Sequence, residues 1–134
     1  MNFWGLVWQL PQILLGALVA LFTGARKVNG KDFFVTTAGQ FGVSLGYFII
    51  FGVRGYTISG IDYHHEVGHR RQSELLGPLY LLLIGLPSLF GNIWDRLFHS
   101  KWRPFARYEW YYKLPWEAWA DSLGNVVRFN DLEV

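Results

Sequence analysis

Cysteine is absent from the 134 residues of this chain. Its absence excludes a disulfide framework, a zinc site with thiolate ligands and a cysteine nucleophile. Charged residues are also scarce, at 16% of the chain against about 25% in ordinary soluble domains. Because 51% of the residues are hydrophobic and 19% are aromatic, intrinsic disorder is excluded as well. Any metal ion held by this chain must therefore be bound by histidine and carboxylate side chains.

The length and charge of the chain restrict its organisation and its partners. A chain of this length fits one domain with one hydrophobic core, and we expect residues 1–134 to form it. The formal net charge is only +2, and the basic residues are scattered along the sequence instead of forming one stripe. Nucleic acid is therefore not expected as a partner.

An uncharged apolar stretch runs from Phe3 to Phe22. It is just long enough to cross a hydrocarbon core, which takes about 20 residues, but Pro11 favours a shorter helix that begins there. A core or interfacial helix within residues 1–24 is the favoured interpretation, and a spanning helix is the alternative. Basic residues follow at Arg26, Lys27 and Lys31. In the spanning alternative they place the rest of the chain in the cytoplasm. A cytoplasmic or membrane-associated protein is therefore expected.

A small antiparallel sheet is predicted between residues 28 and 59. Asn29-Gly30 is a typical hairpin turn pair, and glycine interrupts a series of runs rich in β-branched and aromatic residues. These predicted strands are residues 33–37, 43–51 and 56–58.

Helices are predicted on either side of an uncharged segment. The capping-box pattern of Ser59–Asp62 opens a helix that we expect to end at Leu76, where a glycine-proline pair stops it. Glycine and proline also interrupt the uncharged stretch 75–94, which favours packed short helices over one spanning helix. Pro115 favours a last helix over residues 116–128. The elements together predict an α+β fold.

The pattern H-E-x-x-H occupies residues 65–69 of the first predicted helix. At this spacing the Cβ atoms of His65 and His69 lie about 5–6 Å apart on one face, so both rings can reach one metal ion. Glu66 borders the same face and is suited to act as general base on a metal-bound water. A catalytic zinc needs a third protein ligand. The alternative is an ordinary pair of surface or core histidines.

Glu117 is the strongest candidate for the third ligand, with Glu109 as the second choice. Glu117 and Asp121 lie one helical turn apart, so Asp121 can accept the remaining ring N–H of a ligating histidine, preferably His65. The alternative for Glu117 is an acidic residue that merely stabilises a helix N-terminus.

H-E-V-G-H at residues 65–69 followed by E-A-W-A-D at residues 117–121 resembles the gluzincin group of zinc metallopeptidases. The resemblance implies a minimal zincin-like domain with a sheet packed on the active-site helix and a C-terminal ligand helix. It implies Zn²⁺ bound by His65, His69 and Glu117, with Glu66 as general base and Asp121 as support. In such families a tyrosine or histidine outside the metal set stabilises the oxyanion. The residues available for this are Tyr108, Tyr111, Tyr112 and His99.

Two functions are consistent with these patterns. The first is a zinc-dependent hydrolase of peptide bonds, in which the strand at 43–51 aligns a peptide or protein substrate by strand addition. Gly68, inside the metal-binding helix, is expected to contact the backbone of that sheet. The second is a membrane-associated or partner-binding module with a structural metal and little or no catalysis. A fourth side chain at the metal, such as His99, would favour this second function, since structural zinc sites are closed.

Overall fold

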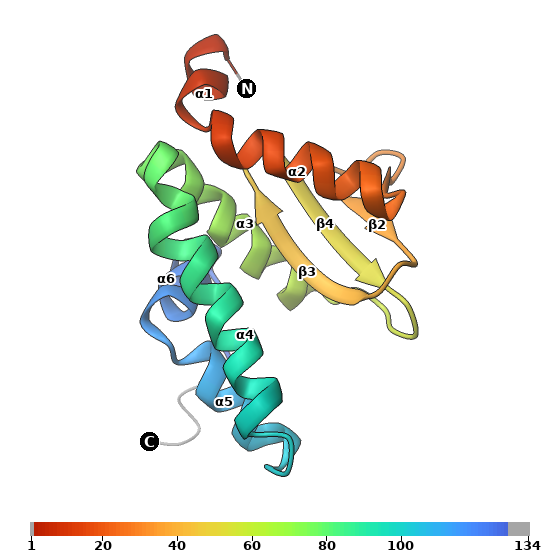
Figure 1. The fold of residues 1–134 in the computed structure, drawn as a ribbon, viewed down its shortest axis with the longest axis vertical. Helices are drawn as coiled ribbons and strands as arrows, with labels where there is room; N and C mark the ends of the chain where they lie inside the picture. Colours follow the sequence, from red (N-terminus) through yellow and green to blue (C-terminus); the bar gives the residue numbers. More distant parts are fainter. Residues whose placement is uncertain (1, 129–134) are drawn as a thin grey trace.

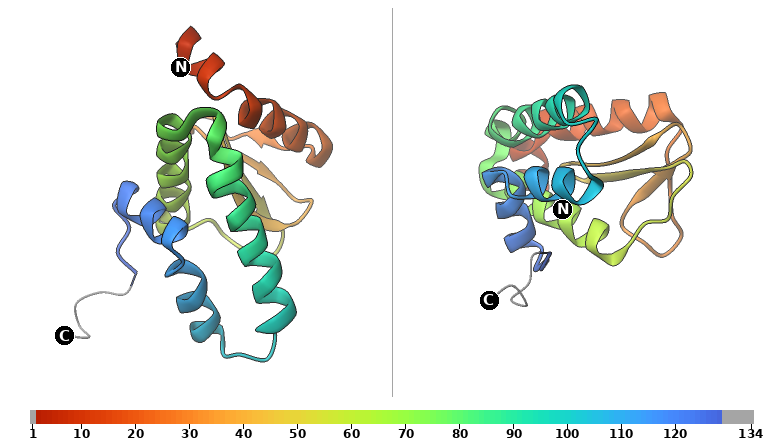
Figure 2. Two further views of the ribbon diagram at one scale, coloured as in Figure 1. Left: turned by 60° about the vertical axis from the view of Figure 1, so that its left-hand side comes forward. Right: turned by 90° about the horizontal axis from the view of Figure 1, so that it is seen from below.

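The computed structural model describes residues 2–128. Its helices are α1 (Phe3–Trp8), α2 (Leu10–Thr23), α3 (Gly60–Leu76), η1 (Gly77–Leu79), η2 (Leu81–Gly85), α4 (Leu86–Phe98), α5 (Pro104–Tyr112) and α6 (Pro115–Leu123). Its strands are β1 (Arg26–Lys27), β2 (Phe34–Thr36), β3 (Gln40–Leu45) and β4 (Phe48–Val53). The sheet lies between α2 on one face and α3 on the other (Figures 1 and 2). The predicted α+β class is confirmed.

The sheet is mixed, whereas the sequence predicted a purely antiparallel one. Its strand order is β1-β2-β4-β3, with β2 and β4 parallel and the other two pairs antiparallel. The cause is a turn at Gly46, which has a positive φ of 64° and divides the predicted strand 43–51 into β3 and β4. The returning β4 inserts beside β2 and leaves β3 at the edge. Residues 56–58, predicted as a strand, do not form one.

The start of α3 is built as its sequence predicted. The Ser59 hydroxyl accepts a hydrogen bond from the Asp62 amide at 3.1 Å, and the Asp62 carboxylate accepts one from the Ser59 amide at 3.0 Å. The helix ends at Leu76, also as predicted. α6 ends at Leu123, earlier than the predicted residue 128, because Asn125 adopts a positive φ of 58° that ends the helical path.

Gly68 marks a close approach between α3 and α6, not between α3 and the sheet. A Cβ atom at Gly68 would lie 1.8 Å from the carbonyl oxygen of Ala120. Gly124, directly after α6, allows a second close approach to α3, since a Cβ atom there would lie 2.0 Å from the carbonyl oxygen of His64. The expectation of a sheet contact was therefore wrong, and the two glycines instead allow the two helices that carry the H-E-x-x-H and E-x-x-x-D patterns to touch.

The N-terminal stretch forms two helices, with a break at Gln9. The predicted helix from Pro11 corresponds to α2, whose 14 residues extend about 21 Å and are too short to cross a hydrocarbon core of about 30 Å. Its buried positions are Gln12 and Gly16. The Gln12 amide donates to Ser73 Oγ and to the carbonyl of Gly77, both at 2.8 Å, which fixes α2 against the end of α3.

The segment Leu81–Phe98 is one continuous helical stretch, which corrects the prediction of packed short helices. It consists of the π-helical turn η2 followed by α4. The wide turn directly precedes Pro87 and accommodates its missing N–H, so the proline does not end the helix. Within residues 2–128 this is the one helix long and apolar enough to cross a membrane, and only 11% of it is buried.

Candidate metal centre

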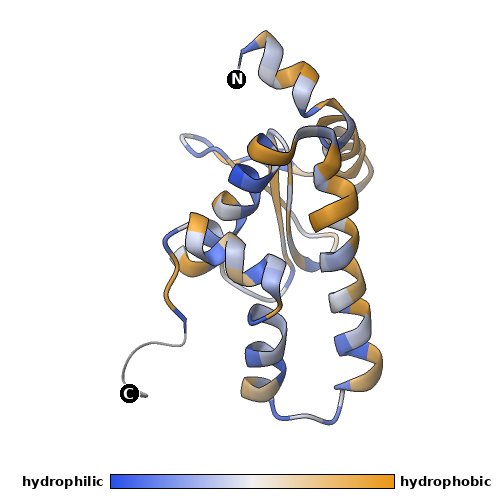
Figure 3. Ribbon diagram, turned by 90° about the vertical axis from the view of Figure 1, so that its left-hand side faces the viewer, coloured by the Kyte–Doolittle hydropathy of each residue, from blue (hydrophilic) through white to orange (hydrophobic). Residues whose placement is uncertain are grey.

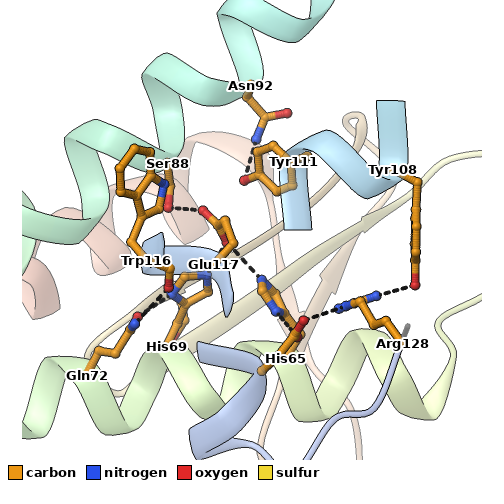
Figure 4. A network of polar contacts seen from close by, with 12 residues as sticks. His65, His69, Gln72, Ser88, Asn92, Tyr108, Tyr111, Trp116, Glu117 and Arg128 are labelled. Atoms are coloured by element: carbon orange, nitrogen blue, oxygen red, sulfur yellow. Dashed lines mark hydrogen bonds and ion pairs between the residues drawn. The ribbon is translucent and has the colours of Figure 1, made fainter. Parts of the chain in front are cut away.

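Three side chains from two helices meet at one buried point. Glu117 Oε1 of α6 lies 3.1 Å from His65 Nε2 and 2.9 Å from His69 Nε2 of α3. All three residues are buried, and their ligand atoms lie within 4.8 Å of one another (Figure 4). Two imidazoles and one carboxylate are a donor set that zinc accepts in catalytic sites, so these residues fit the ion. Glu117 is thus the third member of a group that could hold a metal ion.

Among the described residues, this group is the only cluster of metal-binding side chains that could hold an ion. Glu109, the second choice of ligand, is not part of it and instead pairs with Lys113 at 3.6 Å on the surface of α5.

The chain matches no protein-family model, no curated protein and no solved structure. A buried His-His-Glu group with an H-E-x-x-H pattern on its helix is therefore what the structure itself establishes. The assignment of chemistry depends on the surroundings of these three residues.

Asp121 supports His65 from the side opposite the ligand atom. Its Oδ1 lies 2.7 Å from His65 Nδ1, which is the hydrogen bond that the sequence predicted. The other oxygen, Oδ2, accepts a hydrogen bond from Arg128 Nε at 2.8 Å. A carboxylate held in this way fixes the ring orientation and directs the Nε2 of His65 toward the metal position. Arg128 was not predicted, because its contact with Asp121 depends on the turn after α6.

His69 is oriented by Gln72, a residue that the sequence analysis did not select. Gln72 Oε1 lies 2.6 Å from His69 Nδ1, and Gln72 Nε2 donates to the carbonyl of Trp116 at 2.9 Å. The side chain thus fixes the ring and links α3 to the first turn of α6 (Figure 4). Its spacing of three residues from His69 on one helix was an available signal.

α4 contributes a third side of the site. The Ser88 hydroxyl donates a hydrogen bond to Glu117 Oε2, which leaves Oε1 directed at the two histidines. One turn further along α4, Asn92 Nδ2 donates to the hydroxyl of Tyr111 at 3.1 Å (Figure 4). Burial and the negative charge of Glu117 raise the pKa of Tyr111 far above its ordinary value, so its hydroxyl stays protonated.

The four residues proposed to stabilise an oxyanion lie in different surroundings. Tyr111 borders Glu117, and the ring of Tyr112 packs edge-on against His65 with centroids 5.1 Å apart. The Tyr108 hydroxyl accepts a hydrogen bond from Arg128 at 2.7 Å. His99 lies at the end of α4, where it contacts Asp95 and the rings of two tryptophans instead of the metal-binding group.

Glu66 lies beside the histidine pair and faces the edge of the sheet. Its side chain is buried, and its Oε1 has no hydrogen-bond partner within the described part of the chain. Its Oε2 would lie 3.3 Å from a Cβ atom built at Gly42 of β3. Burial raises the pKa of Glu66 above its ordinary value, although the neighbouring histidines oppose this shift.

The charges of the triad are coupled. Burial alone would lower the pKa of His65, but its hydrogen bonds with Asp121 and Glu117 raise it to about 9. Burial opposes ionisation of Glu117 too, but hydrogen bonds from His65 and His69 hold its pKa well below its usual range. The geometry therefore favours a positive charge between Glu117 and Asp121, where either a proton or a metal ion can supply it.

Proposed function

We propose that this protein is a zinc-dependent hydrolase of peptide bonds, with the ion held by His65, His69 and Glu117. The observation that carries the proposal is the position of Glu66, whose carboxylate is buried beside the histidine pair with Oε1 unpaired. A bound zinc ion in such a site polarises a carbonyl group and lowers the pKa of water to about 7.

Glu66 has the properties of a general base. The three proposed ligands, His65, His69 and Glu117, do not include Glu66. Its carboxylate is therefore free to accept a proton and pass it to the leaving amine. Burial raises the pKa of Glu66 toward neutral pH, which favours both uptake of a proton from water and its release to the leaving amine. A residue that only stabilised the fold would be expected to have both carboxylate oxygens paired.

The number of protein ligands at the site supports catalysis over a structural role. Structural zinc sites have four protein ligands, and the group within residues 2–128 offers three. The example of a fourth ligand named from the sequence was His99, and its ring instead packs against Trp102, with centroids 3.6 Å apart. We therefore favour the hydrolase.

The edge strand β3 supports a peptide as the substrate. β3 pairs with β4 on one side only, so its other edge can add an extended chain through main-chain hydrogen bonds. Gly42 on this strand lies beside the carboxylate of Glu66, and it is exposed. A peptide added along β3 would pass the general base.

Tyr111, with its protonated hydroxyl near Glu117, is the best-placed donor for the carbonyl oxygen.

The substitution Glu66→Gln tests this function. It should leave the zinc content per chain unchanged and abolish cleavage of a peptide library by the zinc-loaded protein. Glu109→Gln, at a partly exposed glutamate of α5, is the matched control and should retain both properties. Loss of zinc in Glu66→Gln would make Glu66 a ligand, and a zinc-loaded wild-type protein that cleaves no peptide would contradict the proposal.

A further inference from the structure

α2 buries the polar residue Gln12 next to α3 and presents most of its large apolar residues to the outside, although Val19 packs against the core. The buried positions are Gln12, which hydrogen-bonds α3, and Gly16, which contacts Phe48 of β4. The exposed positions are Leu10, Leu14, Leu15, Leu18, Leu21 and Phe22. Leu21 and Phe22 are 75% and 84% exposed. This arrangement is the reverse of a helix on the surface of a water-soluble protein.

The segment Leu81–Phe98 has the same inverted arrangement. Three of its polar side chains bond to other helices, Ser88 to Glu117, Asn92 to Tyr111 and Asp95 to Arg107, while Arg96 is exposed in its last turn. Its exposed large apolar residues are Leu82, Leu83, Leu86, Leu89, Phe90, Ile93, Trp94, Leu97 and Phe98. In water, burial of the apolar stripe would be the favourable choice, so this helix is built for a non-aqueous neighbour.

The two helices lie in the same layer of the molecule. In Figure 1 α2 lies in front of the sheet and α4 lies in front of α6, and the view from below in Figure 2 shows both helices along one side. Hydropathy colouring shows apolar residues concentrated in the N-terminal helices and in the long helix (Figure 3). We call the exposed apolar residues of α2 and Leu81–Phe98 the apolar face. Large exposed apolar surfaces mark sites that bind a partner, a ligand or a membrane.

Basic and aromatic residues at the ends of these helices indicate what covers the apolar face. Exposed Arg26 and Lys27 directly follow α2. Exposed Lys101 and Arg103, with the half-exposed ring of Trp102 between them, directly follow α4. Cationic side chains next to an apolar surface complement the anionic headgroups of a bilayer, and tryptophan favours the interface. If a second copy of this chain covered the apolar face, its own basic residues would face the basic residues of the first copy.

We infer that the apolar face binds a lipid bilayer, with α2 and Leu81–Phe98 lying along the membrane surface. An in-plane position fits the molecule better than a spanning one, because the sheet packs against α2, and α5 and α6 pack against α4. α3 carries exposed charged residues such as Arg71 and Glu74, which a spanning arrangement would bring to the level of the lipid tails.

Flotation of the purified full-length protein with lipid vesicles tests this inference. The wild-type protein should float with phosphatidylcholine vesicles, and more strongly when phosphatidylglycerol is included. The double substitution Leu89→Glu with Phe90→Glu should weaken vesicle binding about tenfold or more, since both side chains are exposed and lose their apolar contact with lipid. Leu18→Glu on α2 should weaken it too. Ile61→Glu, at an exposed apolar residue of α3, is the matched control and should bind as wild type.

The outcomes of these measurements distinguish lipid binding from dimer formation. Retained zinc content shows that a variant is folded, and it does not depend on catalysis. A wild-type protein that remains with the aqueous fraction would overturn the inference. So would a stable dimer in detergent-free buffer that binds no vesicles, because a second copy would then cover the apolar face. Equal binding by wild type and by folded Leu18→Glu and Leu89→Glu/Phe90→Glu variants would also contradict it.

Discussion

The carbonyl oxygen of Ala120 lies against Gly68, at a position only 1.8 Å from where a Cβ atom would be. This contact sets the distance between α3 and α6, and the proposed ligands His69 and Glu117 lie one residue and three residues away from it. The spacing of the two helices and the geometry of the metal centre are therefore a single property of the fold.

Substitution of Gly68 by alanine should separate the two helices. Alanine favours the helix by about 1 kcal/mol, but the clash with a backbone carbonyl cannot be relieved by side-chain rotation. We expect a net destabilisation of about 1–3 kcal/mol in urea unfolding, together with weaker zinc binding. Gly60→Ala is the control, because a Cβ there meets no atom within 4 Å. Equal unfolding midpoints for Gly68→Ala and wild type would contradict this account of the helix contact.

Replacement of Asp121 by asparagine should weaken zinc binding about 10–100-fold, the usual cost of losing a carboxylate that orients a ligating histidine. Competition against a chromophoric chelator measures this. Asp95→Asn is a close control, since Asp95 likewise joins a histidine, His99, to an arginine, Arg107, but at the far end of α4. Comparable zinc affinities for Asp121→Asn and Asp95→Asn would show that Asp121 has no special role.

The metal-free protein should lose stability as the pH rises from about 6.5 to about 9. The folded pKa of His65, about 9, lies above its ordinary value of 6.5. The protonated ring therefore stabilises the folded state fully below about pH 6.5, and this contribution disappears as the pH passes about 9. Urea unfolding in the presence of a chelator measures the change.

The variant His65→Gln should remove that part of the pH dependence. Zinc affinity should change in the opposite direction and increase over the same pH range, because the ion displaces protons from the histidines. A metal-free stability that is flat between these pH values in the wild-type protein would contradict the coupling between His65, Glu117 and Asp121.

Local patterns in the sequence predicted much of the site, and contacts between distant segments account for what was missed. The spacing of His65 and His69 fixes their common face within one helix, and Ser59 fixes where that helix begins. Ser88 could not be found in this way, because it meets Glu117 only after α4 and α6 have packed, and Arg128 could not because its contact with Asp121 depends on the turn after α6. Gln72 could have been found from its spacing.

The same distinction explains the errors in the fold. The sequence indicated a close approach at Gly68 but not which element approaches, and it did not reveal that a turn at Gly46 divides one predicted strand into two. The uncharged stretch before Trp94 was visible from composition, whereas the inward direction of Ser88 and the outward direction of the leucines around it depend on the position of α6.

Metal content of the purified protein tests the central claim most directly. Elemental analysis should give one zinc ion per chain for the wild type. The variant Glu117→Gln, in which the shared carboxylate is replaced by a neutral amide of the same shape, should have strongly reduced zinc content. A wild-type protein that takes up no zinc, or a Glu117→Gln variant that keeps its full content, would contradict the assignment of His65, His69 and Glu117 as a metal centre.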